Sequence, residues 1–321
     1  MGFIAKKQKG VILSNISRLA TVLFIASIGF SLADTFWAVY LESFLHSIAL
    51  VGFVSSGLAV FSFLSFFLIV PIIEKYDKSK TFAFSLLLIA ISYFVFAITY
   101  NFYLFLVIAV FFTFFTTLRI TSFGIIVKDK SNKRRLSRNE GLMYTFMNLA
   151  WFVGPLLAGF LSKYFEINIM FGLSGVIVFI SLIYFLFLKI NDNKKRKRVD
   201  KNTVKVFFDF FKNKPRVIAY FLGGGVNYWW SLIYIFIPIY IIKSNLDVSY
   251  VGYFLFAVTI PLMAFSYFFS DLAGKIGFKK IFIIGFFIPC LAALICFFIS
   301  DIYIVMLVLI LASIGLSMTE A

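Results

Sequence analysis

Residues 81 to 100 read TFAFSLLLIAISYFVFAITY, a stretch that contains no Lys, Arg, Asp or Glu. An apolar helix needs about 20 residues to cross about 30 Å of hydrocarbon, so this stretch is long enough to span a membrane. The other stretches of this kind are 19–41, 48–73, 102–127, 140–162, 168–188, 216–242, 248–269, 279–299 and 302 to the end. They are about twice as long as barrel strands and lack polar alternation, which indicates helices. The sequence therefore predicts an all-α, multi-pass membrane protein with ten transmembrane helices.

The composition excludes an ordinary soluble enzyme and a disordered chain. Of the 321 residues, 62% are hydrophobic and 14% are charged, and Phe alone accounts for 46. The mean hydropathy is +1.01. A water-exposed shell cannot cover that much apolar surface, so we expect the lipid bilayer to be the solvent for most of the chain.

The placement of positive charge predicts the orientation of the helices. Of the 30 Lys and Arg residues, 27 fall on the side that holds the N-terminal tail, and the opposite loops hold only Lys163 and Lys243. Because cytoplasmic loops are enriched in Lys and Arg, we expect a cytoplasmic N-terminus in the plasma membrane. The basic run at 194–198 then faces anionic headgroups, and we expect no nucleic-acid partner.

The most charged connection, residues 189–215, divides the chain. It predicts an N-terminal six-helix bundle over 1–188 and a C-terminal four-helix bundle over 216–321. The chain also resembles itself at an offset of 200 residues. The matching pairs include Phe36 with Phe236, Tyr40 with Tyr240, Gly52 with Gly252, Lys75 with Lys275, Lys80 with Lys280 and Phe82 with Phe282. Such a duplication is typical of transporters built from two bundles related by an axis along the membrane normal.

One loop carries a motif that points to a family. The segment SDLAGKIGFKK, Ser270 to Lys280, resembles the loop signature of the major facilitator superfamily. A carboxylate at a helix end, glycines that permit a tight turn, and neighbouring cations can lock helices together on one side of the membrane. The residues in these roles are Asp271, Gly274, Lys275, Gly277, Lys279 and Lys280. In the first half, Pro71 stands where the carboxylate should be, so Glu74 or Asp77 would have to replace it.

The stretch 140–162 carries a second match. Gly154, Pro155 and Gly159 are similar to the Gly-Pro motif of the family's proton-driven exporters, with two of that motif's glycines replaced by alanine. Small residues also let helices pack closely, and proline kinks helices in many membrane proteins. An exporter motif and plain helix packing are both open interpretations.

The resemblance implies more helices than the sequence contains. The family normally has twelve, and the last stretch here ends at Ala321, before the end of its equivalent in the first half. We therefore expect an incomplete sequence that lacks the last two helices, from a protein that works as a monomer.

Charged residues inside the predicted spans are candidates for the functional site, because each costs on the order of 3 kcal/mol at the bilayer centre. Asp34 and Arg119 are two such residues. Their depths differ by roughly 12 Å at 1.5 Å per residue, so we expect a shared aqueous cavity rather than an ion pair. One hypothesis is that Asp34 carries a proton and Arg119 tunes the exchange. The alternative is that Asp34 only hydrogen-bonds solute or water. Glu320 lies one position past the Arg119 equivalent in the repeat.

Other polar and aromatic residues could line a path for an apolar or aromatic solute. The candidates are Tyr40, Tyr240, Asn227, Trp37, Trp151, Trp229 and Trp230. Aromatic belts at the membrane interface would contain the same Tyr and Trp residues, so this role has an alternative. The single His and the two Cys residues do not form a metal motif, and no metal or cofactor is expected.

These features predict a secondary active transporter that works by alternating access, with a small organic solute and a proton or other coupling ion as partners. The match in 140–162 favours proton-coupled efflux, and uptake of a sugar or other metabolite is the alternative. No GxxxxGK[ST] loop is present, so ATP is not the direct energy source within this chain. A membrane-embedded transferase would need clustered His, Asp or Glu, so we expect no catalytic residues and no enzymatic activity.

Overall fold

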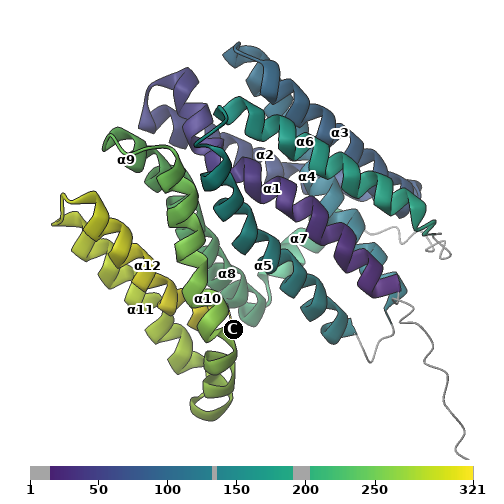
Figure 1. The fold of residues 1–321 in the computed structure, drawn as a ribbon. Helices are drawn as coiled ribbons and strands as arrows, with labels where there is room; N and C mark the ends of the chain where they lie inside the picture. Colours follow the sequence, from purple (N-terminus) through teal and green to yellow (C-terminus); the bar gives the residue numbers. More distant parts are fainter. Residues whose placement is uncertain (1–14, 132–135, 191–202, 321) are drawn as a thin grey trace, which may run out of the picture.

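The computed structural model describes residues 15–131, 136–190 and 203–320, and nearly all of these residues are helical (Figure 1). The elements are α1 (Asn15–Leu45), α2 (Ile48–Lys75), α3 (Lys78–Ile98), α4 (Phe102–Lys130), α5 (Leu136–Leu161), α6 (Ile167–Phe187), α7 (Thr203–Phe211), α8 (Lys214–Ser231), η2 (Leu232–Phe236), α9 (Ile237–Lys243), α10 (Ser249–Ile276), α11 (Phe278–Phe297) and α12 (Ile302–Thr319). In these residues, 10 spans are long and apolar enough to cross a membrane, and α8, η2 and α9 together form one of them. The predicted all-α membrane fold is confirmed.

The two halves of the chain repeat their local hydrogen bonds at an offset of 200 residues. Asn101 begins α4 by accepting a hydrogen bond from the Leu104 N–H (3.1 Å). Asp301 begins α12 by accepting hydrogen bonds from the N–H groups of Tyr303 (2.8 Å) and Ile304 (3.1 Å). Short polar side chains at this position satisfy backbone donors that the first helical turn leaves free.

Tyr40 and Tyr240 provide a second repeated feature. The Tyr40 hydroxyl in α1 donates to the carbonyl oxygens of Phe96 (2.6 Å) and Thr99 (3.0 Å), at the end of α3. The Tyr240 hydroxyl in α9 donates to the carbonyl oxygen of Ser300 (3.3 Å), just after α11. Each tyrosine therefore ties the first span of its half to the end of the third span.

The helices form two groups (Figure 1). Each group has a largely separate apolar core. Helices α1 to α6 surround a core that includes Phe96 and Phe171. Helices α8 to α12 surround a second core that includes Val258 and Leu309, to which α1, α5 and α6 also contribute. In Figure 1, α5 and α10 lie side by side between the two groups. The packing of α5 against α10 therefore joins the groups.

Part of the predicted connection at 189–215 is helical. Residues 191–202 lie outside the described residues, and α7 occupies the stretch that follows. The Phe207 ring of α7 lies 5.5 Å from the Phe67 ring of α2. The Phe211 ring lies 5.9 Å from the Tyr220 ring of α8. This short helix therefore contacts helices of both groups.

The two groups approach closely where α5 crosses α10. A Cβ atom added to Gly252 would lie 2.5 Å from the Gly159 Cα and from the Pro155 carbonyl oxygen. Small residues let helix backbones approach closely in a membrane. Gly154, five residues before Gly159, lies close to a side chain of α1, because a Cβ atom there would lie 2.6 Å from the Ser31 Cβ. The segment from Gly154 to Gly159 therefore packs α5 against both α1 and α10.

Candidate functional site

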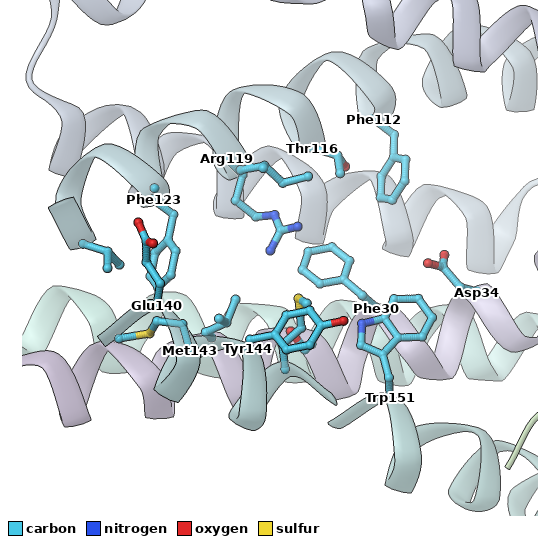
Figure 2. Close-up of a pocket in the computed structure, with 16 residues that line it drawn as sticks. Phe30, Asp34, Phe112, Thr116, Arg119, Phe123, Glu140, Met143, Tyr144 and Trp151 are labelled. Atoms are coloured by element: carbon cyan, nitrogen blue, oxygen red, sulfur yellow. The ribbon is translucent and has the colours of Figure 1, made fainter. Parts of the chain in front are cut away.

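A cavity of about 550 Å³ lies among α1, α4 and α5 (Figure 2). Most of its wall is made of Phe, Met, Leu, Ile, Val and Trp side chains. The polar residues that line it are Ser27, Asp34, Thr116, Arg119, Glu140 and Tyr144. Ligand sites in proteins are typically hollows of about 300 to 1,000 Å³ with an apolar lining and a few polar groups. The cavity has the size and the lining of a site for a small organic molecule.

Asp34 and Arg119 line this cavity from different helices. The Arg119 guanidinium lies 4.1 Å from the centre of the Phe30 ring, and Phe30 lies one turn before Asp34 on α1. In Figure 2 the Phe30 ring lies between the guanidinium and the Asp34 carboxylate. Among the ion pairs of the described residues, none joins Asp34 to Arg119. Because a cation is attracted to an aromatic face, Phe30 holds the guanidinium without neutralising it.

Two hydrogen-bond donors on α4 lack partners in the described part of the chain. They are the Arg119 Nε and the Thr116 Oγ1, and both atoms are buried. The two residues are three positions apart, so their side chains share one face of α4. Both residues line the cavity, and these two donors have no hydrogen-bond partner among the described residues.

A carboxylate from the second group of helices approaches the cavity wall. Glu320, which follows α12, accepts hydrogen bonds from the Trp230 Nε1 (2.6 Å) and the Tyr144 hydroxyl (3.4 Å). The Trp151 ring meets the Tyr234 ring edge to face, with centroids 5.6 Å apart. Tyr144 and Trp151 both line the cavity, so its α5 wall also contacts the second group.

Sequence reasoning did not identify Thr116, Glu140 or Tyr144 as site residues. The available signal was helical spacing, since Thr116 shares a face with Arg119, and Tyr144 lies four residues after Glu140. That signal is weak because hydroxyl side chains occur throughout these helices. Among the described residues, no group of three or more His, Cys, Asp or Glu could hold a metal ion.

Six of the seven aromatic and polar residues predicted to line a solute path lie away from this cavity, among them Trp37, Trp229 and Trp230. Tyr40 and Tyr240 make the repeated bonds near the helix ends described above. Asn227 is exposed and donates from its Nδ2 to the carbonyl oxygen of Gly223 (2.9 Å) in its own helix. Of the predicted aromatic residues, Trp151 lines the cavity.

The two loops compared in the sequence adopt different structures. In the second half, the Asp271 carboxylate accepts a hydrogen bond from the Lys275 Nζ (2.6 Å) within α10, and both side chains are exposed. Gly277 ends α10 with φ of 90°, a conformation that favours glycine. In the first half, Asp77 begins α3 by accepting a hydrogen bond from the Lys80 N–H (3.1 Å). Asp77 therefore serves as a helix cap in this conformation.

The sequence of this chain matches a known family along most of its length. The Major Facilitator Superfamily matches residues 19–321. An uncharacterized MFS-type transporter of Methanocaldococcus jannaschii is 26% identical over 161 residues, which are 49% of this chain and 41% of that protein. The matched region thus spans about two fifths of the relative's length.

Solved structures give the same fold. The nucleoside transporter NupG (D323A mutant) matches with a TM-score of 0.73 at 15% identity, over 94% of this chain and 79% of that one. A POT family transporter in complex with 5-aminolevulinic acid matches with a TM-score of 0.70 at 13% identity, over 98% of this chain and 84% of that one. At these identities the likeness concerns the fold alone. From the sequence match and this fold together, the chain belongs to the Major Facilitator Superfamily, a family of membrane transporters.

Proposed function

We propose that this chain is a proton-coupled secondary transporter that exports a small organic solute across the plasma membrane by alternating access. The observation that supports the proposal is that Asp34 and Arg119 line one cavity without forming an ion pair. Each unpaired charge inside the membrane costs on the order of 3 kcal/mol, so intramembrane charges are expected to serve a function.

Asp34 is the proposed proton carrier. A carboxylate in a largely apolar cavity exchanges its proton with whichever aqueous side the cavity faces. Arg119 stays charged at all physiological pH values, and its attraction to Asp34 depends on the distance between them. Because Phe30 lies against the guanidinium, a movement of this ring would change how readily Asp34 holds its proton.

The contacts between the two groups of helices support the alternating-access part of the proposal. Where α5 crosses α10, Gly159 and Gly252 bring the two backbones together. The cavity extends toward the opposite end of α5, as far as Glu140 (Figure 2). With the N-terminus in the cytoplasm, this conformation faces inward, and solute would leave after the α5–α10 end separates. A monomer suffices for this cycle.

The test is proton flux and solute counterflow with the full-length protein in liposomes, with and without an imposed pH gradient. Asp34→Asn keeps the size of the side chain and removes its titratable proton. We expect it to abolish gradient-driven transport while leaving membrane insertion intact. Glu166→Gln is the matched control, because Glu166 is exposed at the start of α6 and makes no capping bond with its side chain.

Full gradient-driven transport by the Asp34→Asn protein would contradict proton carriage by this residue. The direction is tested with the same liposomes. Movement of solute against the proton flux supports export, whereas movement with the proton flux would replace export by uptake of a metabolite.

A further inference from the structure

Asp34, Thr116 and Arg119 line the cavity, and the Thr116 Oγ1 and the Arg119 Nε have no partner among the described residues. We propose that its solute is a zwitterion with an apolar or aromatic body, whose carboxylate binds Arg119 and Thr116 and whose ammonium group binds Asp34. This inference rests on the transport function proposed above and names the class of its solute.

Arg119 offers one edge of its guanidinium to a carboxylate. Phe30 covers a face of the group at 4.1 Å from the ring centre, which leaves its edges for hydrogen bonding. The buried Nε has no hydrogen-bond partner in the described residues. A guanidinium edge binds a planar carboxylate through two parallel N–H donors, and this arrangement is among the stronger hydrogen-bonded contacts in proteins.

Thr116 differs from its neighbours on α4. Thr113, Thr117 and Thr121 each donate to the carbonyl oxygen four residues earlier, at 2.8 to 2.9 Å. The Thr116 hydroxyl has no such bond within the described residues and lines the cavity beside Arg119. A threonine hydroxyl in a helix ordinarily bonds back to its own helix. The free hydroxyl therefore adds a third donor for the solute's carboxylate.

Asp34 supplies the opposite charge. It lines the cavity on the far side of the Phe30 ring from Arg119 (Figure 2). While Asp34 is ionised, a solute with only an anionic or only a cationic group would compensate one of these charges and leave the other unpaired in the membrane, which is costly. A zwitterion compensates both at once, which favours it over solutes of a single charge.

The remaining wall favours an apolar or aromatic body. Phe112, Phe123, Met143, Met147 and Trp151 line the cavity between and beside the charged residues. A volume of about 550 Å³ accommodates an amino acid or a small peptide with an aromatic side chain.

The test is equilibrium binding by calorimetry to the purified full-length protein, with no pH gradient. Four probes share one aromatic body: phenylalanine carries both charges, phenylalanine amide lacks the carboxylate, N-acetylphenylalanine lacks the ammonium group, and N-acetylphenylalanine amide lacks both. We expect phenylalanine to bind at least about tenfold more tightly than either singly charged probe, as one charged hydrogen-bonded contact is worth about 1.5 to 3 kcal/mol. Equal or weaker binding of phenylalanine, including no binding, would overturn the proposal.

The variants assign each charge to its residue. Thr116→Val keeps the shape of the side chain and should weaken binding of phenylalanine and N-acetylphenylalanine about three- to tenfold, with no change for the amide. Asp34→Asn should weaken the binding of phenylalanine and of phenylalanine amide, and it should leave the binding of N-acetylphenylalanine unchanged. Thr113→Val is the control, since its hydroxyl bonds within α4. A uniform loss across all probes in either variant would indicate a structural role and reject the assignment.

The outcome is separable from that of the transport proposal. Selective binding of the zwitterion without proton-driven flux would retain the solute class and reject proton coupling. Proton-driven flux with no preference among the four probes would retain proton coupling and reject the zwitterionic solute class.

Discussion

The two groups of helices meet differently at the two ends of α5. Near its last turn, Gly159 lies against Gly252 of α10, and backbone atoms make the contact. Near its first turns, Tyr144 reaches Glu320 through a hydrogen bond of 3.4 Å between side chains. The first contact depends on shape and leaves no room for a side chain. The second is long and exchangeable with water, so the groups are better able to separate at the cavity end.

Side-chain contacts reinforce the α5–α10 end. Lys243 of α9 pairs with Glu42 of α1 at 3.3 Å, and Lys163 lies 5.3 Å from the centre of the Tyr253 ring of α10. These are the two basic residues that the sequence places in the loops opposite to the positive side. Each one reaches from its own group of helices to the other, so the difference between the two ends involves charge as well as shape.

The largest expected effect comes from adding a side chain at the α5–α10 crossing. In Gly252→Val, the new Cβ would collide with backbone atoms of Gly159 and Pro155, which cannot rotate away. Overpacking typically lowers the unfolding free energy by about 1 to 3 kcal/mol. Because this variant collides with backbone, we expect a loss of about 3 kcal/mol or more. The measurement is the unfolding free energy in mixed micelles.

Gly57→Ala is the control for that variant, because a Cβ atom at Gly57 in α2 would meet nothing within 4 Å. Its added helix propensity should leave stability unchanged or raise it by up to about 1 kcal/mol. If both variants unfold like the parent protein, the α5–α10 contact is not tight.

A smaller effect is expected where a side chain, rather than backbone, stands in the way. In Gly154→Ala, the new methyl group would overlap Ser31, whose hydroxyl donates to the carbonyl oxygen of Ala150 (3.1 Å). We expect a loss of about 1 to 3 kcal/mol by the same unfolding measurement. Adding Ser31→Gly should recover part of it, and a double variant no more stable than the single one would contradict the assigned collision.

The ion pair between Glu42 and Lys243 should contribute less. Both side chains are partly exposed, so solvent screens the pair, and such pairs are worth about 0.2 to 1 kcal/mol. A double-mutant cycle with Glu42→Gln and Lys243→Met would measure the coupling, which should decline as salt is added. If no coupling is measured at low salt, close packing alone holds the two groups together at the α5–α10 end.

The smallest effect on the unfolding free energy is expected at the end of α5 that lines the cavity. Tyr144→Phe removes the hydroxyl that donates to Glu320, and we expect a change below about 0.5 kcal/mol because the bond is long and exposed. Glu320 keeps its shorter bond to Trp230 (2.6 Å). A loss above about 1 kcal/mol in the same unfolding assay would mean that both ends are held firmly, and the comparison would fail.

Much of the fold could be read from the sequence, and less of the site. The ten spans follow from hydropathy and length, which are local properties. Asp34 and Arg119 could be identified because ionised residues are rare inside apolar spans. Thr116 could not, because its difference from the other threonines of α4 lies only in a missing hydrogen bond. Tyr40 was assigned to the pathway from its chemistry, yet its hydroxyl bonds to Phe96 and Thr99 near the end of α3.

The sequence alone determined that the chain is a bundle of membrane helices with a repeated half, because lipid leaves the backbone few alternatives to helices. The tertiary structure decided which faces of those helices meet. It placed Phe30 against Arg119, and Gly159 against Gly252. Such contacts join residues far apart in the chain, and they depend on how small residues and side-chain shapes fit between helices. No local property of the sequence reports that fit.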